Sequence, residues 1–131
     1  MKASYSVADA AFIIELPESH IRGWLQRAVL NFGSRTLTRR IVFNERDLRC
    51  LAVMRELVAH GLSPNIAAVK ASFIVDRARD HALVAVVSLD PGRSPMLIPG
   101  DGLDLSGHAV VTVALAPMWA EIKQRIRELK K

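Results

Sequence analysis

The hydrophobic pattern of this chain changes at Ala82, and that change limits the possible folds more than any other feature. Before it, apolar residues recur three and four positions apart, as on one face of a helix. After it, residues 82–89 and 109–115 are nearly continuous apolar runs, which are typical of buried strands. A helical pattern that begins at Pro117 closes the chain. The sequence therefore predicts an α+β fold: a mostly helical N-terminal part, then strand, loop, strand and a C-terminal helix.

Two short helices are predicted near the N-terminus. Ser6 followed by Asp9 indicates a helix start, because the serine oxygen can accept hydrogen bonds from the free N–H groups of the first turn. Pro17 fits the first turn of the next helix, where its missing N–H costs nothing. Only Glu15 and Leu16 connect the two patterns, so the sequence predicts a helix-turn-helix.

The following segment predicts a β-hairpin and two more helices. Residues 30–43 are rich in Gly, Ser, Thr and Arg and end in an alternating run, which favours a hairpin wing with a basic tip. Asn44 with Asp47 begins the third helix, and His60-Gly61 ends it, since glycine is the usual residue just past a helix. Ser63-Pro64 opens the fourth helix.

Positive charge is concentrated in the predicted helix-turn-helix and wing. The 131-residue chain has a formal net charge of +5 and a pI near 10.0. Residues 19–42 contain five arginines and no acidic residue, so this stretch alone accounts for the excess. Such a distribution favours a polyanionic partner, above all nucleic acid.

Residues 5–68 resemble a known family in four sequence segments: residues 5–11, 20–24, 43–48 and 57–66. Together they resemble the DNA-binding domain of the MerR family of transcription regulators, in which they correspond to helix one, the recognition helix, the wing exit and the junction of helices three and four. The resemblance implies a winged helix-turn-helix. The chain departs from the family pattern at Glu15, where a glycine is usual, at Trp24, where a tyrosine is common, and at the wing exit, where the arginine is displaced toward Arg39 and Arg40.

The candidate DNA-binding residues divide by chemistry. Ser19 and His20 lie at the start of the recognition helix, where side chains face base edges in the major groove. Five arginines are candidates because their positive charge suits phosphates or the minor groove. They are Arg22, Arg27, Arg35, Arg39 and Arg40. Trp24 is included as a candidate contact, although its spacing favours the core. The alternatives are a solvated side chain or an ion pair within the domain for Arg22, and a merely exposed polar residue for His20.

The C-terminal part is predicted to be a separate unit. We expect residues 1–80 to form the DNA-binding domain and residues 81–131 a β-hairpin with a helix that joins two copies or binds a partner. The two strands and the last helix offer the apolar surface for this contact, the helix through Met118, Ile122, Ile126 and Leu129. The alternative is an intramolecular cap on the fourth helix.

Other classes of site lack support in the sequence. One cysteine, Cys50, excludes an intramolecular disulfide and a zinc site of several thiolates, and we expect it in the core. His60, His81 and His108 do not have the spacing of metal ligands, and we interpret Asp101 and Asp104 as part of a polar loop. We therefore expect no metal, no cofactor, no catalytic residues and no enzymatic activity. No segment is long and apolar enough to span a membrane, and the N-terminus is not a signal peptide, so the sequence predicts a cytoplasmic protein.

The leading hypothesis is a sequence-specific transcription regulator that binds double-stranded DNA as a homodimer. A phage or mobile-element excisionase-like architectural factor shares the pattern. A different class is an antitoxin or adaptor whose C-terminal segment binds a protein, but an adaptor has no reason to exclude acidic residues from residues 19–42. The sequence identifies no small-molecule effector.

Overall fold

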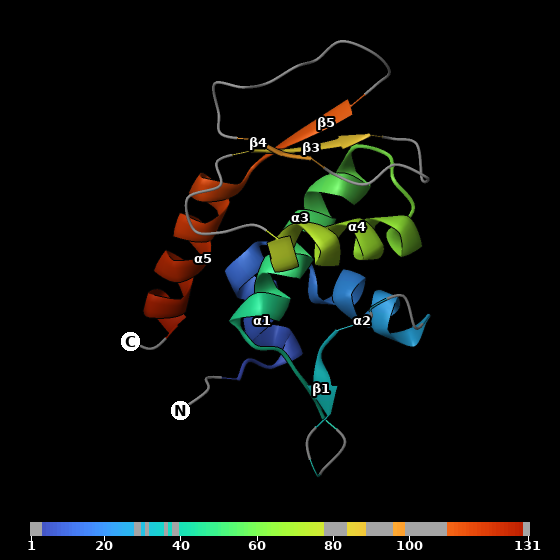
Figure 1. Cartoon of the computed structure of the whole chain (residues 1–131). Coiled ribbons are helices and arrows are strands. Elements are labelled where there is room, and N and C mark those ends of the chain that lie inside the picture. The colour runs from blue at the N-terminus through green and yellow to red at the C-terminus, as the bar shows by residue number, and fades with distance from the viewer. Residues whose placement is uncertain are drawn as a thin grey trace.

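The computed structural model confirms the α+β class (Figure 1). It describes residues 4–27, 30, 32–35, 37, 40–77, 84–88, 96–98 and 110–129, of which 84–88, 96–98 and 110–111 are described as backbone. Helices α1–α4 form the middle of the molecule, a small sheet lies at one end, a hairpin projects from the other, and α5 runs along one side. The elements in chain order are α1 (Val7–Ile14), α2 (Glu18–Gln26), β1 (Ser34–Arg35), β2 (Ile41–Val42), α3 (Glu45–Ala59), α4 (Pro64–Arg77), β3 (Val84–Ser88), β4 (Met96–Ile98), β5 (Val110–Ala114) and α5 (Leu115–Leu129).

The two N-terminal helices begin and end as local chemistry dictates. Ser6 caps α1: its Oγ accepts from the Asp9 N–H at 3.1 Å, while the Asp9 carboxylate accepts from the Ser6 N–H. Helix α1 ends at Glu15, which adopts a left-handed conformation with φ 54° and ψ 52°. Without glycine, that conformation costs about 1–2 kcal/mol. Pro17 is the residue before α2 rather than its first helical residue, one position from the prediction.

The predicted wing is present as the antiparallel pair β1–β2, with Arg35 opposite Ile41. Tyr5 extends it, because its N–H and C=O both pair with those of Phe43 at 2.8 Å. Gly33 has φ +96°, and a Cβ there would lie 3.2 Å from the Phe43 ring. The start of the chain and the exit of the wing are thus held together by backbone hydrogen bonds at the edge of the core.

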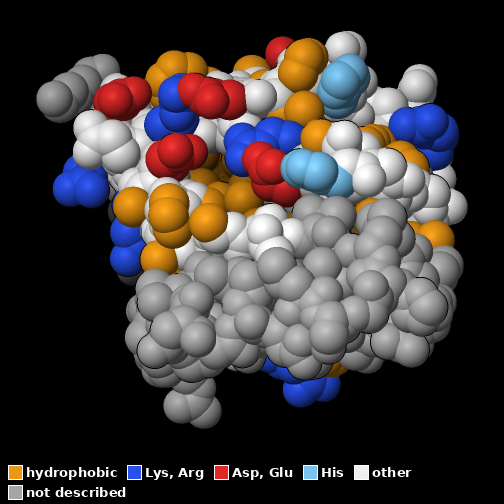
Figure 2. All heavy atoms as spheres, turned by 90° about the horizontal axis from the view of Figure 1, so that it is seen from above, with side chains coloured by type: hydrophobic (Ala, Val, Ile, Leu, Met, Phe, Trp, Pro, Cys, Tyr) orange, Lys and Arg blue, Asp and Glu red, His pale blue; other side chains and the backbone are white. Residues whose placement is uncertain are grey.

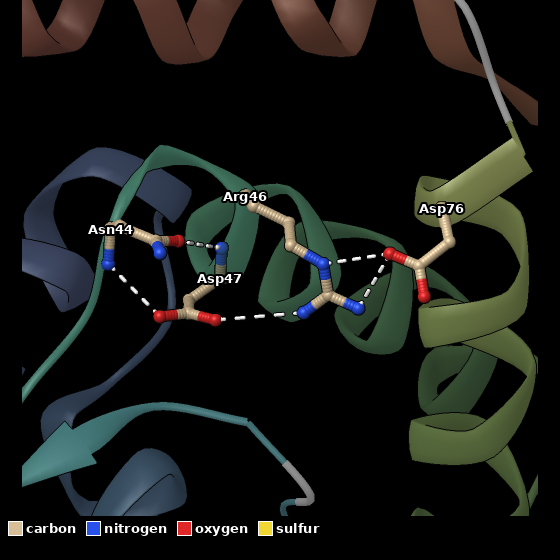
Figure 3. Close-up of polar contacts among 4 residues, drawn as sticks. All are labelled: Asn44, Arg46, Asp47 and Asp76. Atoms are coloured by element: carbon tan, nitrogen blue, oxygen red, sulfur yellow. Dashed lines mark hydrogen bonds and ion pairs between the residues drawn. The ribbon is translucent and has the colours of Figure 1, made fainter.

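Helix α3 begins with the predicted cap (Figure 3). The Asn44 Oδ1 accepts from the Asp47 N–H at 2.8 Å, and the Asp47 carboxylate accepts from the Asn44 N–H at 3.0 Å. Asp47 is only 4% exposed, so this capping box also satisfies a buried carboxylate. At the other end, Gly61 takes φ +105° and closes α3, as the sequence indicated.

The C-terminal sheet has a strand that the sequence did not predict. Residues 96–98 were expected in a loop, but they form β4, which pairs with β3. The order is β4-β3-β5, with β3 antiparallel to both neighbours. The central strand thus has its backbone groups paired on both sides, which a two-stranded hairpin cannot provide.

The apolar face of α5 is used within the chain, which corrects the expectation that it joins two copies. Met118, Ile122 and Ile126 are buried, and the helix packs against α1 and α3. The sequence also offered an intramolecular cap on α4, and in the structure it is β4 that contacts α4, whereas α5 packs on α1 and α3. Strand β5 leads directly into α5 at Leu115, two residues before the predicted start. One apolar core therefore includes residues from both halves of the chain.

Cys50 is fully buried, as expected. In the described part of the chain no helix combines the length and apolar character that crossing a membrane requires.

Candidate nucleic-acid interface

The first turn of α2 presents two of the predicted contact residues to solvent. Ser19 and His20 are both exposed, while Ile21 and Trp24 are buried beneath them. Because residues three apart share a helix face, the burial of Ile21 and Trp24 turns Ser19 outward, while His20 lies at the side of the helix in its exposed first turn. The N-terminal end of α2 is therefore free to meet a partner.

Three predicted arginines line one open groove. Arg22 comes from α2, Arg35 from β1, and Arg40 from the segment before β2. The groove has a volume of about 700 Å³ and includes the N-terminal turn of α1; it is lined by Ser6, Val7, Ala8, Arg22, Leu25, Gln26, Arg35, Arg40 and Ile41. All three arginines are exposed. Charges separated by up to 18 positions in the sequence thus face the same space.

The N-terminal turn of α1 adds to the electrostatics of this groove. The helix dipole favours negative charge at such a turn, where the Asp9 carboxylate of the capping box already lies. Sequence reasoning had identified Ser6 as a cap but had not included it, Ala8 or Gln26 in the site. The cap at Ser6 was the available signal; the approach of the wing to α1 was not visible in the sequence.

Arg22 makes an ion pair within the helix. Its Nη2 lies 2.6 Å and its Nε 3.0 Å from the same Glu18 Oε1. This is the alternative that the sequence left open, and Glu18 lies one residue before the acid-free stretch. The Arg22 side chain remains 63% exposed, and Nη1 takes no part in these contacts, so the guanidinium keeps a donor outside the ion pair.

Two other predicted arginines are placed differently. Arg27 follows the last residue of α2, and its Nε donates to the Gly23 carbonyl at 3.3 Å. It is exposed but does not line the groove. Arg39 lies outside the described residues, as do His81, His108, Asp101 and Asp104.

The structure corrects the candidate role of Trp24. Its side chain is 4% exposed and belongs to the main hydrophobic core. A side chain in that position supports α2 from beneath and has no surface left for a base or a phosphate. The core interpretation, which the helical spacing favoured, is the one the structure bears out.

At the end opposite the wing, the side chains that the structure describes form a mixed surface (Figure 2). There acidic and basic side chains are interspersed among hydrophobic and histidine side chains. In the part of the chain that is described, no group of three or more His, Cys, Asp or Glu residues could hold a metal ion. The candidate interface is therefore the arginine-lined groove with the adjacent turn of α2.

Comparison with known proteins agrees with this geometry. A family model described as MerR HTH family regulatory protein matches residues 5–70, about half of the chain. The match covers α1, α2, the wing, α3 and the first half of α4. Among curated proteins, the comparison found no match.

Proposed function

Since this chain belongs to the MerR family of helix-turn-helix regulatory proteins, and is thus a DNA-binding transcription regulator, we propose that it binds double-stranded DNA sequence-specifically and as a homodimer. The observation that carries the proposal is the groove in which Arg22, Arg35 and Arg40 face one space beside the exposed turn of α2. Arginines at that location meet phosphates and fix the position of the protein on the duplex.

The residues divide into two proposed roles. Ser19 and His20 read base edges from the first turn of α2, as N-terminal residues of a recognition helix do. Arg22, Arg35 and Arg40 contact phosphates across the groove. Arg27 and Arg39 contribute further positive charge for phosphates.

We propose that residues 1–80 carry the DNA-binding surface and residues 81–131 the contact with a second copy. A dimer places one recognition helix on each half of a two-fold symmetric operator. With the apolar face of α5 buried inside the chain, the edge of the sheet at β5 is our candidate for this contact among the described residues. Strand β5 is an edge strand, and its Thr112 and Ala114 side chains are exposed while Val113 is buried.

A salt titration of DNA binding tests the proposal. We expect the full chain to bind random-sequence duplex at low salt and its affinity to fall steeply as salt rises, because each neutralised phosphate releases counterions. Arg35→Ala and Arg40→Ala should each reduce the slope by about one. Arg127→Ala is the matched control, because it removes the same charge from α5. Absence of binding at low salt, or equal slopes for all three variants, would contradict the proposal.

A further inference from the structure

We infer that α5 holds the helix-turn-helix in its DNA-binding geometry, and that Arg125 is a positioning residue which acts on the recognition helix through Glu15. This inference rests on the proposed DNA-binding function, because the geometry it concerns is that of α2. It gives the C-terminal helix a role within the same chain that is separate from dimerisation.

The turn between α1 and α2 depends on Glu15. Among the described residues, Glu15 is the only non-glycine residue with positive φ. The chain reverses there in two steps: the Leu16 N–H donates to the Ala11 carbonyl at 3.1 Å, and Pro17 precedes the first residue of α2. Only three residues separate α1 from α2, so the backbone angles at Glu15 help to set the direction in which α2 leaves α1.

Arg125 of α5 holds this turn from a distance of 110 positions in the sequence. Its Nη2 donates to the Glu15 Oε1, and its Nη1 lies 3.4 Å from the Phe12 carbonyl oxygen. Its guanidinium also lies 5.6 Å from the centre of the Phe12 ring. One side chain therefore contacts the last turn of α1 at the carbonyl, the aromatic ring and the carboxylate.

A second arginine, Arg55 of α3, supports the same end of α1. Its Nη1 donates to the Ile14 carbonyl, and its Nη2 lies 2.9 Å from the Glu56 carboxylate. The last carbonyls of a helix lack partners within the helix and carry partial negative charge, which explains why cations gather there. The turn before α2 is thus held from two neighbouring helices, one of them in the C-terminal part.

The contact between Arg125 and Glu15 lies outside the apolar packing of α5. The two side chains are 29% and 56% exposed, whereas Ile122, one turn earlier on α5, is 2% exposed. Loss of the polar contact should therefore leave α5 docked and the chain folded, while the turn gains freedom. This separation makes a positioning role distinguishable from a purely structural one.

Amide hydrogen exchange of the full chain tests the contact without DNA. The variants are Arg125→Ala and its control Arg127→Ala, which removes a charge two positions away on α5. The Arg127 Nε donates to the Lys123 carbonyl within the same helix. We expect faster exchange at the amides of Leu16 and His20, which close the turn, in Arg125→Ala alone. Unfolding curves first establish that both variants are folded. Equal exchange in the two variants would overturn the inference, whether or not the protein binds DNA.

Affinity measurements then test the role of the contact in recognition. The probes are a duplex selected by the parent chain from a random pool and an unselected random duplex. Arg125→Ala should weaken binding to the selected duplex by about fivefold or more. Its affinity for the random duplex should equal that of Arg127→Ala. Arg125→Lys should restore part of the loss, and Arg125→Ala should have little further effect in the Glu15→Gly background. If the loss is the same for both duplexes, or persists in that background, Arg125 does not act through Glu15.

Discussion

Arg46 and Asp76, which are 30 residues apart, join the first turn of α3 to the last turn of α4 (Figure 3). Both the Nε and the Nη2 of Arg46 lie 2.7 Å from the Asp76 Oδ1. The Nη1 of Arg46 lies 3.7 Å from the Asp47 Oδ1 of the capping box. The ion pair therefore links the start of α3 to the end of α4, beyond residues 5–70 that match the family model.

We predict that the Arg46–Asp76 pair stabilises the fold only modestly. The side chains are 40% and 56% exposed, and ion pairs with such exposure typically contribute about 0.2–1 kcal/mol. A double-mutant cycle with Arg46→Ala and Asp76→Ala, measured by urea unfolding, gives the coupling energy, and it should decrease as salt is added. A coupling energy well above this range, or one insensitive to salt, would contradict the prediction.

Positioning and sequence readout should separate in DNA-binding assays. We expect Arg40→Ala to weaken binding to selected and random duplexes alike, because phosphates carry no sequence information. His20→Ala and Ser19→Ala should instead cost about 1–3 kcal/mol on the selected duplex alone. Competition titrations with both duplexes measure the difference. A His20→Ala variant with unchanged preference for the selected duplex would remove His20 from the readout surface.

Replacement of Trp24 should affect stability rather than specific contacts. Because the side chain is 4% exposed in the core, Trp24→Ala should lower the free energy of unfolding by about 3–5 kcal/mol. Trp24→Phe fills more of the same space and should bind DNA much as the parent does. Urea unfolding and duplex titration of both variants decide the matter. Specific loss of DNA binding in a fully stable Trp24→Phe variant would restore Trp24 as a contact residue.

Because the apolar face of α5 is buried within the chain, substitutions on it should change the free energy of unfolding rather than the oligomeric state. Ile122 is 2% exposed, so Ile122→Ala should lower the free energy of unfolding by about 2–5 kcal/mol. The exposed neighbour Lys123 is the control, and Lys123→Ala should change that free energy by less than about 0.5 kcal/mol. Light scattering of the folded variants should give the same mass as the parent. A stable Ile122→Ala variant of lower mass would place Ile122 between subunits.

The thiol of Cys50 should report on unfolding. Burial raises its pKa from 9.0 to about 12, although the nearby Arg46 acts in the opposite direction. At pH 8 the native thiol should therefore react slowly with a disulfide reagent and quickly once urea unfolds the chain. Above pH 9 the unfolded thiol ionises before the folded one, so the stability that this group contributes is lost between pH 9 and about 12. Rapid labelling of the native protein at pH 8 would contradict the buried assignment.

The sequence alone determined the features that depend on residues within about four positions. The caps at Ser6 and Asn44 and the glycine that ends α3 follow from side chains that bond their own backbone nearby. Helical periodicity likewise indicated the burial of Ile21 and, for Trp24, made the core the favoured interpretation. These local signals predicted the helices, the family resemblance implied the winged helix-turn-helix, and the DNA-binding face suggested by the arginine-rich stretch stays a prediction.

Only the tertiary structure decided which distant segments meet. An apolar helix face buries itself equally well against another subunit or against its own chain, so the sequence could not show that Ile122 and Ile126 pack within the molecule. Residues 96–98 form a strand only because β3 offers them backbone partners, which a short apolar run does not reveal. The contact of Arg125 with Glu15 spans 110 positions, and its charges carry no mark of their partner in the sequence. Packing brings these groups together, because the free energy that selects the arrangement comes from the whole core rather than from any local pattern.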